Sequence, residues 1–544
     1  MSCSRRAFLV SAAATTGCRL VRDSIVALPR PASLRAAWQG LAGAFSDGGV
    51  TVIEANNAAW AVRWELLSGA RRSIDASYFT VDDDVFGLAL LGRLLERAEA
   101  GVAVRLLIDA RGSQDLAANA GDHLQELVQS GADVEVFNPP LSQLLRALLD
   151  VSPTALACGT HNKILVVDGT TALTGGRNIG HLYFSTAAEH PEAFVDADLV
   201  LDGPAAVAAV ASVMNDEFEA RANERVHADV INLVSRRQEL LLIAAAMDAW
   251  VRGLVPGGPL DVVAAGLEEA ALGDDSLGDR PVDPAAVDAA RPRFFELAGL
   301  GSLWSTVPSP APGARHFSAE TQVLASAARV LRRDNTVTEA LERAIEGSRE
   351  RIVLESPYFI PSPRLVLALE DASRRGVEIH LLTNSPLSSD NPASQALFID
   401  SWPEIVGRVP RLRVFAGATA QTLHAKRAVF DEQLTFVGSY NLDPFSASVN
   451  SELVVATWSK PFAAATSQAQ ARRLADGSMV EYLVERDGGG LPRRAPSGQA
   501  NSGRVLVRFG PEQHTPPRQL ERLRALKALI LSQRGLWDFE VLAW

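Results

Sequence analysis

The sequence has 544 residues. A single hydrophobic core does not extend over a chain of this length, so we expect at least two domains. The composition is that of a globular protein, and no apolar run approaches the length that crosses a bilayer. The net charge of −12 and the pI of about 5.4 disfavour a surface that grips nucleic-acid backbone. The three cysteines, Cys3, Cys18 and Cys158, fit neither a disulfide framework nor a structural zinc site.

Residues 1–18 have the pattern of a targeting segment. Arg5 and Arg6 precede a short, mildly apolar stretch, which resembles a bacterial twin-arginine export signal. The alternative is a frayed N-terminus in which the two arginines are incidental. Thr16-Gly17-Cys18 could also end a lipoprotein signal, with Cys18 as the lipidated residue. We therefore predict an exported protein, periplasmic or membrane-associated; the alternative location is the cytoplasmic face of the membrane.

Two segments of the chain repeat the same order of elements. Residues 73–109 run strand, Tyr-Phe, helix, Gly-Val and strand, and residues 351–384 repeat that order. This alternation indicates a strand–helix–strand unit with a mainly parallel sheet. The period is far too long for a solenoid, so we predict a duplicated α/β domain.

A short polar pattern follows each of these units. A histidine, a lysine, an aspartate, a small pair and an asparagine have identical spacing in both copies. The first copy contains His161, Lys163, Asp168, Gly175, Gly176 and Asn178, and the second contains His424, Lys426, Asp431, Gly438, Ser439 and Asn441. One His-x-Lys on a strand is usually incidental. Two copies in register inside a duplicated domain predict a functional site.

The paired pattern suits a phosphodiester substrate. Residues i and i+2 of a strand face the same side, so the histidine and lysine of each copy point together. Two domains packed about a pseudo-twofold axis can bring both faces into one cleft. Lysines and amides stabilise charge on a transferring phosphoryl group, one imidazole can attack phosphorus, and the other can protonate the leaving alkoxide. A covalent phosphohistidine needs no metal or cofactor, and we expect neither.

Each nucleophilic or acidic imidazole also needs a carboxylate behind its ring. An acid follows each copy on a strand, in the segments DADLV and NSELV. By analogy between the copies, we expect Asp198 to serve His161 and Glu452 to serve His424.

Other residues of the pattern are expected to support the site. Asp168 and Asp431 are predicted to lie in hairpin turns, outside the chemistry. The small residues are expected to let backbone approach the phosphate closely. These are Gly175, Gly176, Gly438 and Ser439.

The paired H-x-K-x4-D segments, each followed by a small pair and an asparagine, resemble the phospholipase D superfamily over residues 51–458. Finer features are similar to the bacterial cardiolipin synthase C type. They are GGRNIG at 175–180, F-x-D-x-D at 194–198, TNS at 383–385 and the segment 438–452. The resemblance implies metal-independent phosphatidyl transfer through phosphohistidine, with His161 as nucleophile and His424 as general acid. His181-Leu182 replaces the acidic pair usual in the family, which leaves the acceptor alcohol open.

We predict five segments along the chain. They are an export signal at 1–18, a first phospholipase D-like domain at 35–222, a linker at 223–320, a second phospholipase D-like domain at 321–486, and a loop with a C-terminal amphipathic helix at 487–544. The linker is expected to be helices and loop packed on the side, and the alternative is a lid or a membrane-contacting element. The terminal helix could dock on the protein or lie on anionic lipid.

The expected function is phosphatidyl transfer or hydrolysis on phospholipid at a membrane surface. Both motifs lie on one chain, so we expect a monomer to be active, and we expect no nucleic-acid partner. A nuclease of the same superfamily is the alternative enzyme, which the acidic composition disfavours. A non-catalytic lipid-binding protein is the alternative of another class, which two complete motifs disfavour. The head group and the balance between hydrolysis and transfer stay open.

Overall fold

The structure is a computed structural model that describes residues 30–118, 122–139, 158–220, 222–227, 235–252, 283–300, 314–328, 335–496 and 502–532. The predicted export signal and Cys18 lie outside the described residues. None of the helices within these ranges has the length and apolar character needed to cross a membrane.

The two halves of the chain build matching sets of strands. The first half contributes β1 (Ala44–Ile53), β2 (Ser73–Tyr78), β3 (Ala103–Asp109), β4 (Asp133–Phe137), β5 (Lys163–Val167), β6 (Thr171–Gly175), β7 (Asp198–Leu201) and β8 (Asn223–Arg225). The second half contributes β9 (Ala314–Ser326), β10 (Arg351–Glu355), β11 (Glu378–Thr383), β12 (Leu412–Gly417), β13 (Arg427–Phe430), β14 (Leu434–Gly438), β15 (Glu452–Trp458), β16 (Met479–Val484) and β17 (Val507–Phe509).

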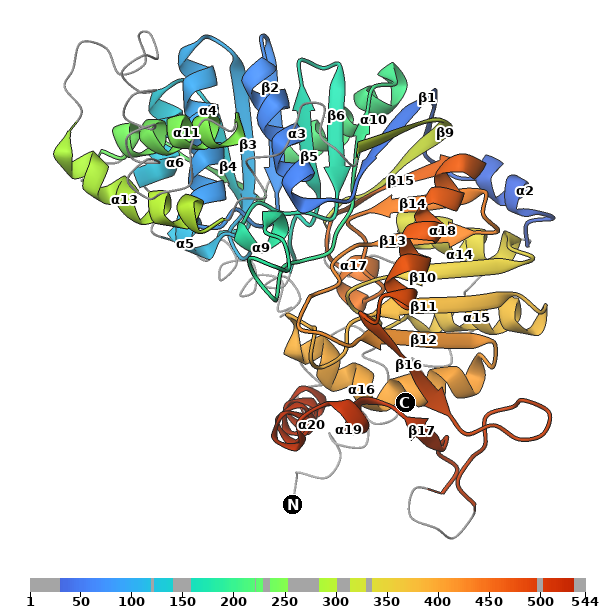
Figure 1. Ribbon diagram of the computed structural model, residues 1–544. Coiled ribbons are helices and arrows are strands. Elements are labelled where there is room, and N and C mark those ends of the chain that lie inside the picture. The colour runs from blue at the N-terminus through green and yellow to red at the C-terminus, as the bar shows by residue number, and fades with distance from the viewer. Residues whose placement is uncertain are drawn as a thin grey trace, which may run out of the picture.

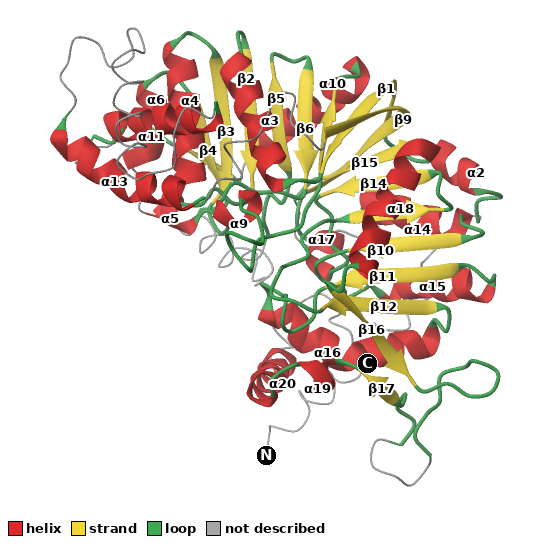
Figure 2. Cartoon of the chain, viewed as in Figure 1, coloured by secondary structure: helices red, strands yellow, loops and turns green. Residues whose placement is uncertain are grey.

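Helices flank both sets of strands, as Figure 2 shows. In the first half and the linker they are α2 (Leu34–Gln39), α3 (Asn56–Gly69), α4 (Val85–Glu99), α5 (Gln114–Ala118), α6 (Asp122–Gln129), α9 (His181–Phe184), α10 (Pro204–Phe218), α11 (Arg237–Val251) and α13 (Pro284–Gly299). In the second half they are α14 (Thr336–Gly347), α15 (Pro363–Arg374), α16 (Pro392–Arg408), α17 (Pro444–Ser448), α18 (Lys460–Ala475), α19 (Pro511–His514) and α20 (Pro517–Ser532).

Strand pairing runs in one line through both halves. The order is β8-β4-β3-β2-β5-β6-β7-β1-β9-β15-β14-β13-β10-β11-β12-β16-β17. The order within each half is the same, reading outward from the central antiparallel pair β1 and β9. The strands change direction around this pair, so the two halves meet at an angle (Figure 1). The predicted duplicated α/β fold is therefore confirmed.

The prediction of a mainly parallel sheet is wrong. Among the strands that the structure describes, parallel pairing occurs in β2-β3-β4 and in its counterpart β10-β11-β12. The remaining pairs are antiparallel, including the hairpins β5-β6 and β13-β14. The strand–helix–strand pattern identifies only the parallel strands of each half. The hairpin that carries each histidine motif adds antiparallel strands beside them, and the pattern does not reveal these.

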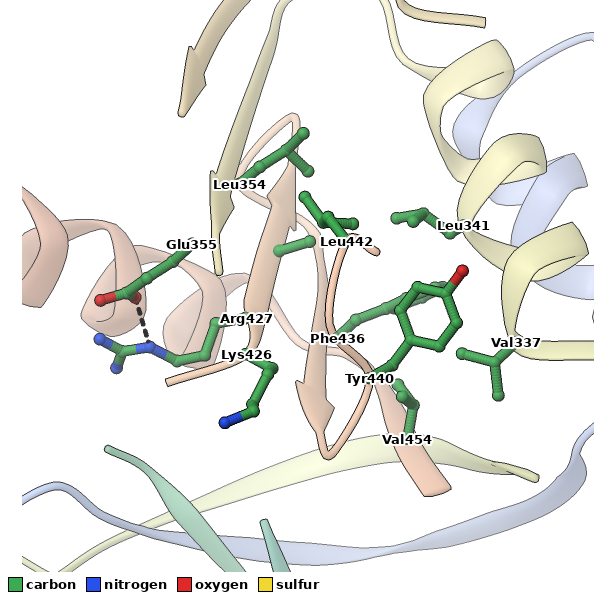
Figure 3. Close-up of a pocket in the computed structure, with 11 residues that line it drawn as sticks. Val337, Leu341, Leu354, Glu355, Lys426, Arg427, Phe436, Tyr440, Leu442 and Val454 are labelled. Carbon is green, nitrogen blue, oxygen red and sulfur yellow. Dashed lines mark hydrogen bonds and ion pairs between the residues drawn. The ribbon is translucent and has the colours of Figure 1, made fainter. Parts of the chain in front are cut away.

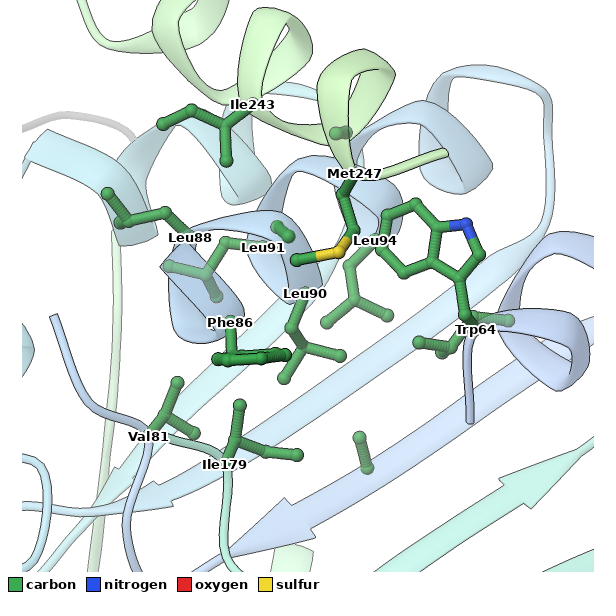
Figure 4. Packing of buried hydrophobic residues seen from close by; sticks show 14 of the residues in the cluster. Trp64, Val81, Phe86, Leu88, Leu90, Leu91, Leu94, Ile179, Ile243 and Met247 are labelled. Carbon is green, nitrogen blue, oxygen red and sulfur yellow. The ribbon is translucent and has the colours of Figure 1, made fainter. Parts of the chain in front are cut away.

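The described helix α11 of the linker and the C-terminal helix α20 both pack on the protein. Helix α11 lies against α4, where Ile243 and Met247 meet Leu88, Leu91 and Leu94 (Figure 4). A Cβ on Gly92 of α4 would lie 2.2 Å from the Leu240 oxygen, so the glycine allows this close crossing. At the other end of the molecule, Leu523 of α20 packs with Ala396 and Ile399 of α16.

Candidate functional site

The two copies of the histidine motif meet where the halves join. Each motif begins just before a strand, β5 or β13, and is bonded through its backbone to the opposite half. The His161 N–H donates to the Ser451 oxygen at 3.2 Å. The His424 N–H donates to the Val195 oxygen at 2.8 Å. These loops converge at the bend between the halves (Figure 2), and the structure therefore brings both motifs together.

Each histidine ring contacts a carboxylate from the other half. The His161 Nδ1 atom lies 3.1 Å from Glu452 Oε2, and the His424 Nδ1 atom lies 2.6 Å from Asp196 Oδ2. The predicted pairs, Asp198 with His161 and Glu452 with His424, are therefore wrong. Crosswise pairing makes each histidine depend on both halves.

The strand register explains the error. Gly175 of β6 pairs with Asp198 of β7, whereas the equivalent Gly438 of β14 pairs with Val454 of β15. Asp198 is thus the counterpart of Val454, and Asp196 is the counterpart of Glu452. The segment between Gly175 and Asp196 is longer than the segment between Gly438 and Glu452. Aligning the two halves on the acid that precedes Leu-Val therefore matches Asp198 with Glu452, which is wrong by about one side-chain repeat of a strand.

Both lysines are buried beside their histidines. The Lys163 Nζ atom donates to the His161 oxygen at 2.6 Å, and the Lys426 Nζ atom donates to the His424 oxygen at 2.5 Å. Burial lowers the pKa of Lys163 to about 7, and the charge of Lys426 lowers it too. Burial lowers the pKa of Lys426 to about 8. An anionic ligand between them would favour the protonated form of both ammonium groups.

The two histidines have different electrostatic surroundings. Burial, followed by the charges of Lys163 and Lys426, puts the pKa of His161 well below its ordinary value, which favours the neutral ring. Burial and Lys426 also lower the pKa of His424, but Asp196 opposes them. The first ring therefore suits a nucleophile, and the second holds a proton more readily.

The carboxylates of Asp196 and Glu452 have pKa values shifted in opposite directions. Burial would raise the pKa of Asp196, but His424, Lys426 and Arg177 keep it below its ordinary value. Burial raises the pKa of Glu452 to about 7, although Lys163 opposes the rise. The Glu452 carboxylate accepts hydrogen bonds from the Ser439 and Ser446 hydroxyls. An anion thus lies behind His424, and a group that titrates near neutrality lies behind His161.

The asparagines of the motifs are buried near the rings. The Asn178 Oδ1 atom accepts the Thr80 N–H at 3.1 Å, and its Nδ2 atom donates to the Tyr183 hydroxyl at 2.8 Å. The Asn441 N–H donates to Ser446 Oγ at 3.0 Å, and the Asn441 Oδ1 atom has no hydrogen-bond partner in the described part of the chain. The first amide is held in place, and the second can still accept a hydrogen bond.

Aromatic side chains flank both histidine rings. Phe194 stacks on His424 with ring centroids 5.0 Å apart, and Tyr183 contacts the same ring edge-on. Phe79 contacts His161 edge-on at 5.2 Å. These contacts restrict the orientation of each imidazole. Phe194 and Tyr183 were missed as site residues; Phe194 occurs in the F-x-D-x-D segment, but the sequence does not indicate its stacking on the second histidine.

The small residues of the motifs allow strands to approach each other. A Cβ on Gly175 would lie 2.4 Å from the Ala197 oxygen, and one on Gly438 would lie 2.1 Å from the Leu453 oxygen. A Cβ on Gly176 would lie 2.1 Å from Asp196 Oδ1. In the second half, Ser439 replaces that glycine and its hydroxyl donates to Glu452. The close approach in the structure is therefore to β7, β15 and a carboxylate.

Asp168 and Asp431 lie in the hairpin turns with positive φ angles of 55° and 47°. Their carboxylates accept backbone N–H groups at the start of β2 or β10. The donors are Arg71, Arg72 and Ser73 for Asp168, and Arg349, Glu350 and Arg351 for Asp431. These two aspartates tie each turn to the neighbouring strand at the end of the hairpin away from its histidine, as the turn assignment predicts.

Asp198 belongs to a buried ion network behind the site. Its Oδ2 atom lies 2.8 Å from Arg63 Nη1 and 3.0 Å from Arg177 Nη1, and all three side chains are buried. The equivalent space of the second half is apolar. Leu341, Tyr440 and Val454 line a cavity there of about 30 Å³, beside Lys426 (Figure 3).

Glu217 of α10 is a further buried acid under the first motif. Its Oε1 atom accepts Asn162 Nδ2 at 2.6 Å, and its Oε2 atom accepts Ser77 Oγ at 3.4 Å. Burial raises its pKa to about 7. Glu217 was not predicted as a site residue, because a glutamate near the end of an amphipathic helix carries no signal that it is buried.

The described residues contain no group of three or more histidine, cysteine, aspartate or glutamate side chains arranged to hold a metal ion.

Comparisons with known proteins agree with this geometry. A family model described as "Cardiolipin synthase, PLD-like domain" matches residues 64–220 and 341–473. Cardiolipin synthase C of Escherichia coli (strain K12) is 28% identical over 432 residues, which cover 74% of this chain and 80% of that protein. Cardiolipin synthase A of Pseudomonas syringae pv. syringae (strain B728a) is 25% identical over 421 residues, which cover 77% of this chain and 66% of that protein.

Among solved structures, phosphatidylserine synthase from Haemophilus influenzae Rd KW20 has the same fold, with a TM-score of 0.57 at 12% identity. The match covers 92% of this chain and 98% of that one. The family match spans more than half of the chain and contains both histidine motifs. The chain therefore belongs to the phospholipase D-like family of the cardiolipin synthase type, and it is a phospholipase D-type enzyme.

Proposed function

We propose that the protein transfers a phosphatidyl group between alcohols at a membrane surface, through a phosphohistidine and without a metal. The observation that carries the proposal is the crosswise pairing of His161 with Glu452 and of His424 with Asp196. In this arrangement Nδ1 of each ring faces a carboxylate, which leaves each Nε2 atom for the substrate. The names of the relatives favour phospholipid as the substrate.

In the first step, His161 Nε2 attacks the phosphorus atom and the bond to the head-group oxygen breaks. His424 gives its Nε2 proton to the departing alkoxide, so the alcohol leaves neutral. Lys163, Lys426 and Asn441 surround the phosphoryl oxygens and stabilise their charge. The diacylglycerol phosphate is then covalently attached to His161.

In the second step, an acceptor alcohol enters beside His424. The neutral His424 ring takes the hydroxyl proton while the oxygen attacks phosphorus and the bond to His161 breaks. Water in place of the alcohol gives hydrolysis. One chain carries every group named here, so a monomer is the proposed active species. The proposed export signal at residues 1–18 would place the reaction outside the cytoplasm.

The direct test incubates purified protein with vesicles of phosphatidylglycerol and phosphatidylethanolamine, with and without glycerol, and identifies products by mass spectrometry. New phosphatidyl esters or phosphatidic acid are expected. His161→Ala and His424→Ala should each abolish turnover nearly as completely as the double change, because the residues act as one unit. Cleavage of oligonucleotides without any change in lipid would contradict the proposal.

Metal independence has its own test. Activity should be unchanged after exhaustive EDTA treatment, because the ammonium groups of Lys163 and Lys426 stabilise the phosphoryl charge. Activity lost to the chelator and restored by Mg²⁺ or Zn²⁺ would mean that a metal, not the lysine pair, is the main electrostatic stabiliser.

A further inference from the structure

Arg177 is buried immediately behind the carboxylate that contacts His424. Its Nη2 atom donates to the Asp196 backbone oxygen at 2.9 Å and to the Asn56 side chain at 2.9 Å. Its Nη1 atom donates to Asp198 Oδ2 at 3.0 Å. Arg177 therefore contacts the backbone of Asp196 and the side chain of Asp198, two residues later.

The Arg177 guanidinium also binds the C-terminal end of β1. It donates to the backbone oxygens of Ile53 at 3.2 Å and Glu54 at 2.6 Å. Arg177 thus connects the end of β1 with the start of β7, and it has no exposed surface. A planar group with donors in fixed directions can hold several acceptors at once, which lysine cannot do.

The second half has no equivalent arginine. Tyr440 occupies the position of Arg177, since Gly176 and Ser439, and Asn178 and Asn441, are equivalent residues of the two motifs. The Tyr440 hydroxyl contacts Thr338 Oγ1 at 2.7 Å. The Glu452 carboxylate, counterpart of Asp196, is bonded to serine hydroxyls instead. The halves therefore differ most in what supports the two carboxylates.

Resting on the function proposed above, we propose that Arg177 is a positioning residue that assigns the proton-donating role to His424, by holding Asp196 in contact with the ring. The proton held at His424 Nε2 passes to the leaving alkoxide, while His424 Nδ1–H remains bonded to Asp196. Without Arg177 the Asp196 carbonyl loses its guanidinium donor while its neighbours Val195 and Ala197 keep their backbone bonds. We then expect the short contact of 2.6 Å between Asp196 and His424 to lengthen.

Several other groups face the His424 ring. Lys426 lies over it, with Nζ 2.8 Å from Nδ1 and 3.0 Å from Nε2. Phe194 and Tyr183 contact its faces and edge, and Asp390, just before α16, raises its pKa from farther away. Arg177 lies behind Asp196 and so acts on His424 mainly through that carboxylate. Removing Arg177 is therefore expected to lower the fraction of His424 rings that carry a proton to donate.

The test compares Arg177→Met with Tyr440→Phe, the matched change in the other half. Two substrates are used: phosphatidylglycerol, whose alkoxide needs a proton to leave, and phosphatidyl-p-nitrophenol, whose leaving group does not. Arg177→Met should lower turnover of phosphatidylglycerol about 10- to 100-fold. The burst of p-nitrophenol should change less than about threefold, because general-acid assistance is dispensable there. Tyr440→Phe should affect both substrates equally and weakly.

A second readout does not depend on turnover. In protein labelled with ¹⁵N-histidine, the His424 resonance of Arg177→Met should titrate at lower pH than in the wild type, and the His161 resonance should not move. Arg177→Met leaves Asp198 paired with Arg63 at 2.8 Å, so the fold has a remaining ion pair. If that variant does not fold, Arg177→Lys is used in the same two measurements.

The outcomes separate the two proposals. Equal losses on both substrates, with an unchanged His424 titration, would overturn the role of Arg177 and leave the phosphatidyl transfer intact. Wild-type protein that acts on neither lipid would overturn the proposed function. The titration of His424 would then still decide whether Arg177 controls its proton.

Discussion

The space behind the carboxylate strand is filled in two opposite ways in the two halves. In the first half, Asp198 lies between Arg63 and Arg177. In the second, Val454, Leu341 and Tyr440 occupy the equivalent positions and line a small cavity. Arg63 and Leu341 are equivalent because α3 and α14 connect to β2 and β10 by segments of equal length. The same backbone arrangement thus accommodates an ion network, in which every buried charge has a partner, or a cluster of apolar side chains.

This difference shows why a duplicated fold need not have duplicated chemistry. Arg177 of the ion network supplies positive charge close to Asp196, whereas Leu341, Tyr440 and Val454 supply none to Glu452. The histidines and lysines of the two motifs are alike in both copies, whereas the residues behind them are not. The asymmetry of the reaction is therefore expected to come from the layer behind the motifs.

The largest expected effect comes from breaking the ion network in the middle. Asp198→Val would leave Arg63 and Arg177 buried without an anion, and should lower the free energy of unfolding by about 3–5 kcal/mol. Arg63→Leu combined with Asp198→Val and Arg177→Tyr recreates the packing of the second half. The triple variant should lose less stability than the single one, because no buried charge is left unpaired.

Urea unfolding followed by circular dichroism measures both variants, with Val454→Ala as the control in the second half. Val454→Ala removes apolar packing only and should cost less than Asp198→Val. A triple variant as unstable as the single one would mean that the two halves are not interchangeable in this layer. The triple variant should also show the general-acid defect expected for Arg177→Met.

The sequence predicts the larger features of this comparison. The repeated strand–helix–strand order identifies the duplicated fold, and the constant spacing from His161 to Asn178 and from His424 to Asn441 identifies the residues that meet. Spacing within a hairpin is local, so it survives in both copies and can be recognised without a structure.

The sequence does not predict which acid meets which histidine. The contact between a histidine and its carboxylate joins the two halves, and it depends on the pairing register of β6 and β7. The loop before β7 differs in length from its counterpart before β15, so the sequence favours Asp198 where the structure has Asp196. Arg63 and Glu217 were missed for a related reason. A charged residue on a helix is expected to be exposed, and only the packed structure shows that these two are buried with partners.

A smaller effect, on turnover, is expected where the small residues of the two motifs differ, at Gly176 and Ser439. Gly176→Ala places a methyl group against Asp196 Oδ1, so the carboxylate must turn away from His424. Turnover of phosphatidylglycerol should fall about 100-fold, the lower end of what general-acid catalysis contributes. Ser439→Ala removes one hydroxyl from Glu452, which keeps the Ser446 hydroxyl and the His161 ring, and it also removes the acceptor of the Leu453 N–H. Its loss should be nearer to the effect of one hydrogen bond, about tenfold.

Steady-state kinetics on both substrates distinguish these variants. The Gly176→Ala defect should nearly disappear with phosphatidyl-p-nitrophenol, whereas the Ser439→Ala defect should persist because it affects the nucleophile. The reverse result would exchange the roles proposed for His161 and His424.

The smallest effect is expected at the hairpin turns, where Glu432 of the second half stands in the place of Gly169 of the first. The first turn is Asp168-Gly169, with φ angles of 55° and 65°, and the second is Asp431-Glu432, with φ angles of 47° and 51°. A side chain at positive φ is strained, and glycine relieves the strain at the cost of greater freedom in the unfolded chain. Glu432→Gly should therefore stabilise the protein by about 0.5–1 kcal/mol, and Gly169→Ala should destabilise it by about 1 kcal/mol. Glu432→Ala is the control, because it removes the weak contact with Arg351 but keeps the strain. If Glu432→Gly and Glu432→Ala have the same urea midpoint, the backbone conformation does not account for the difference between the turns.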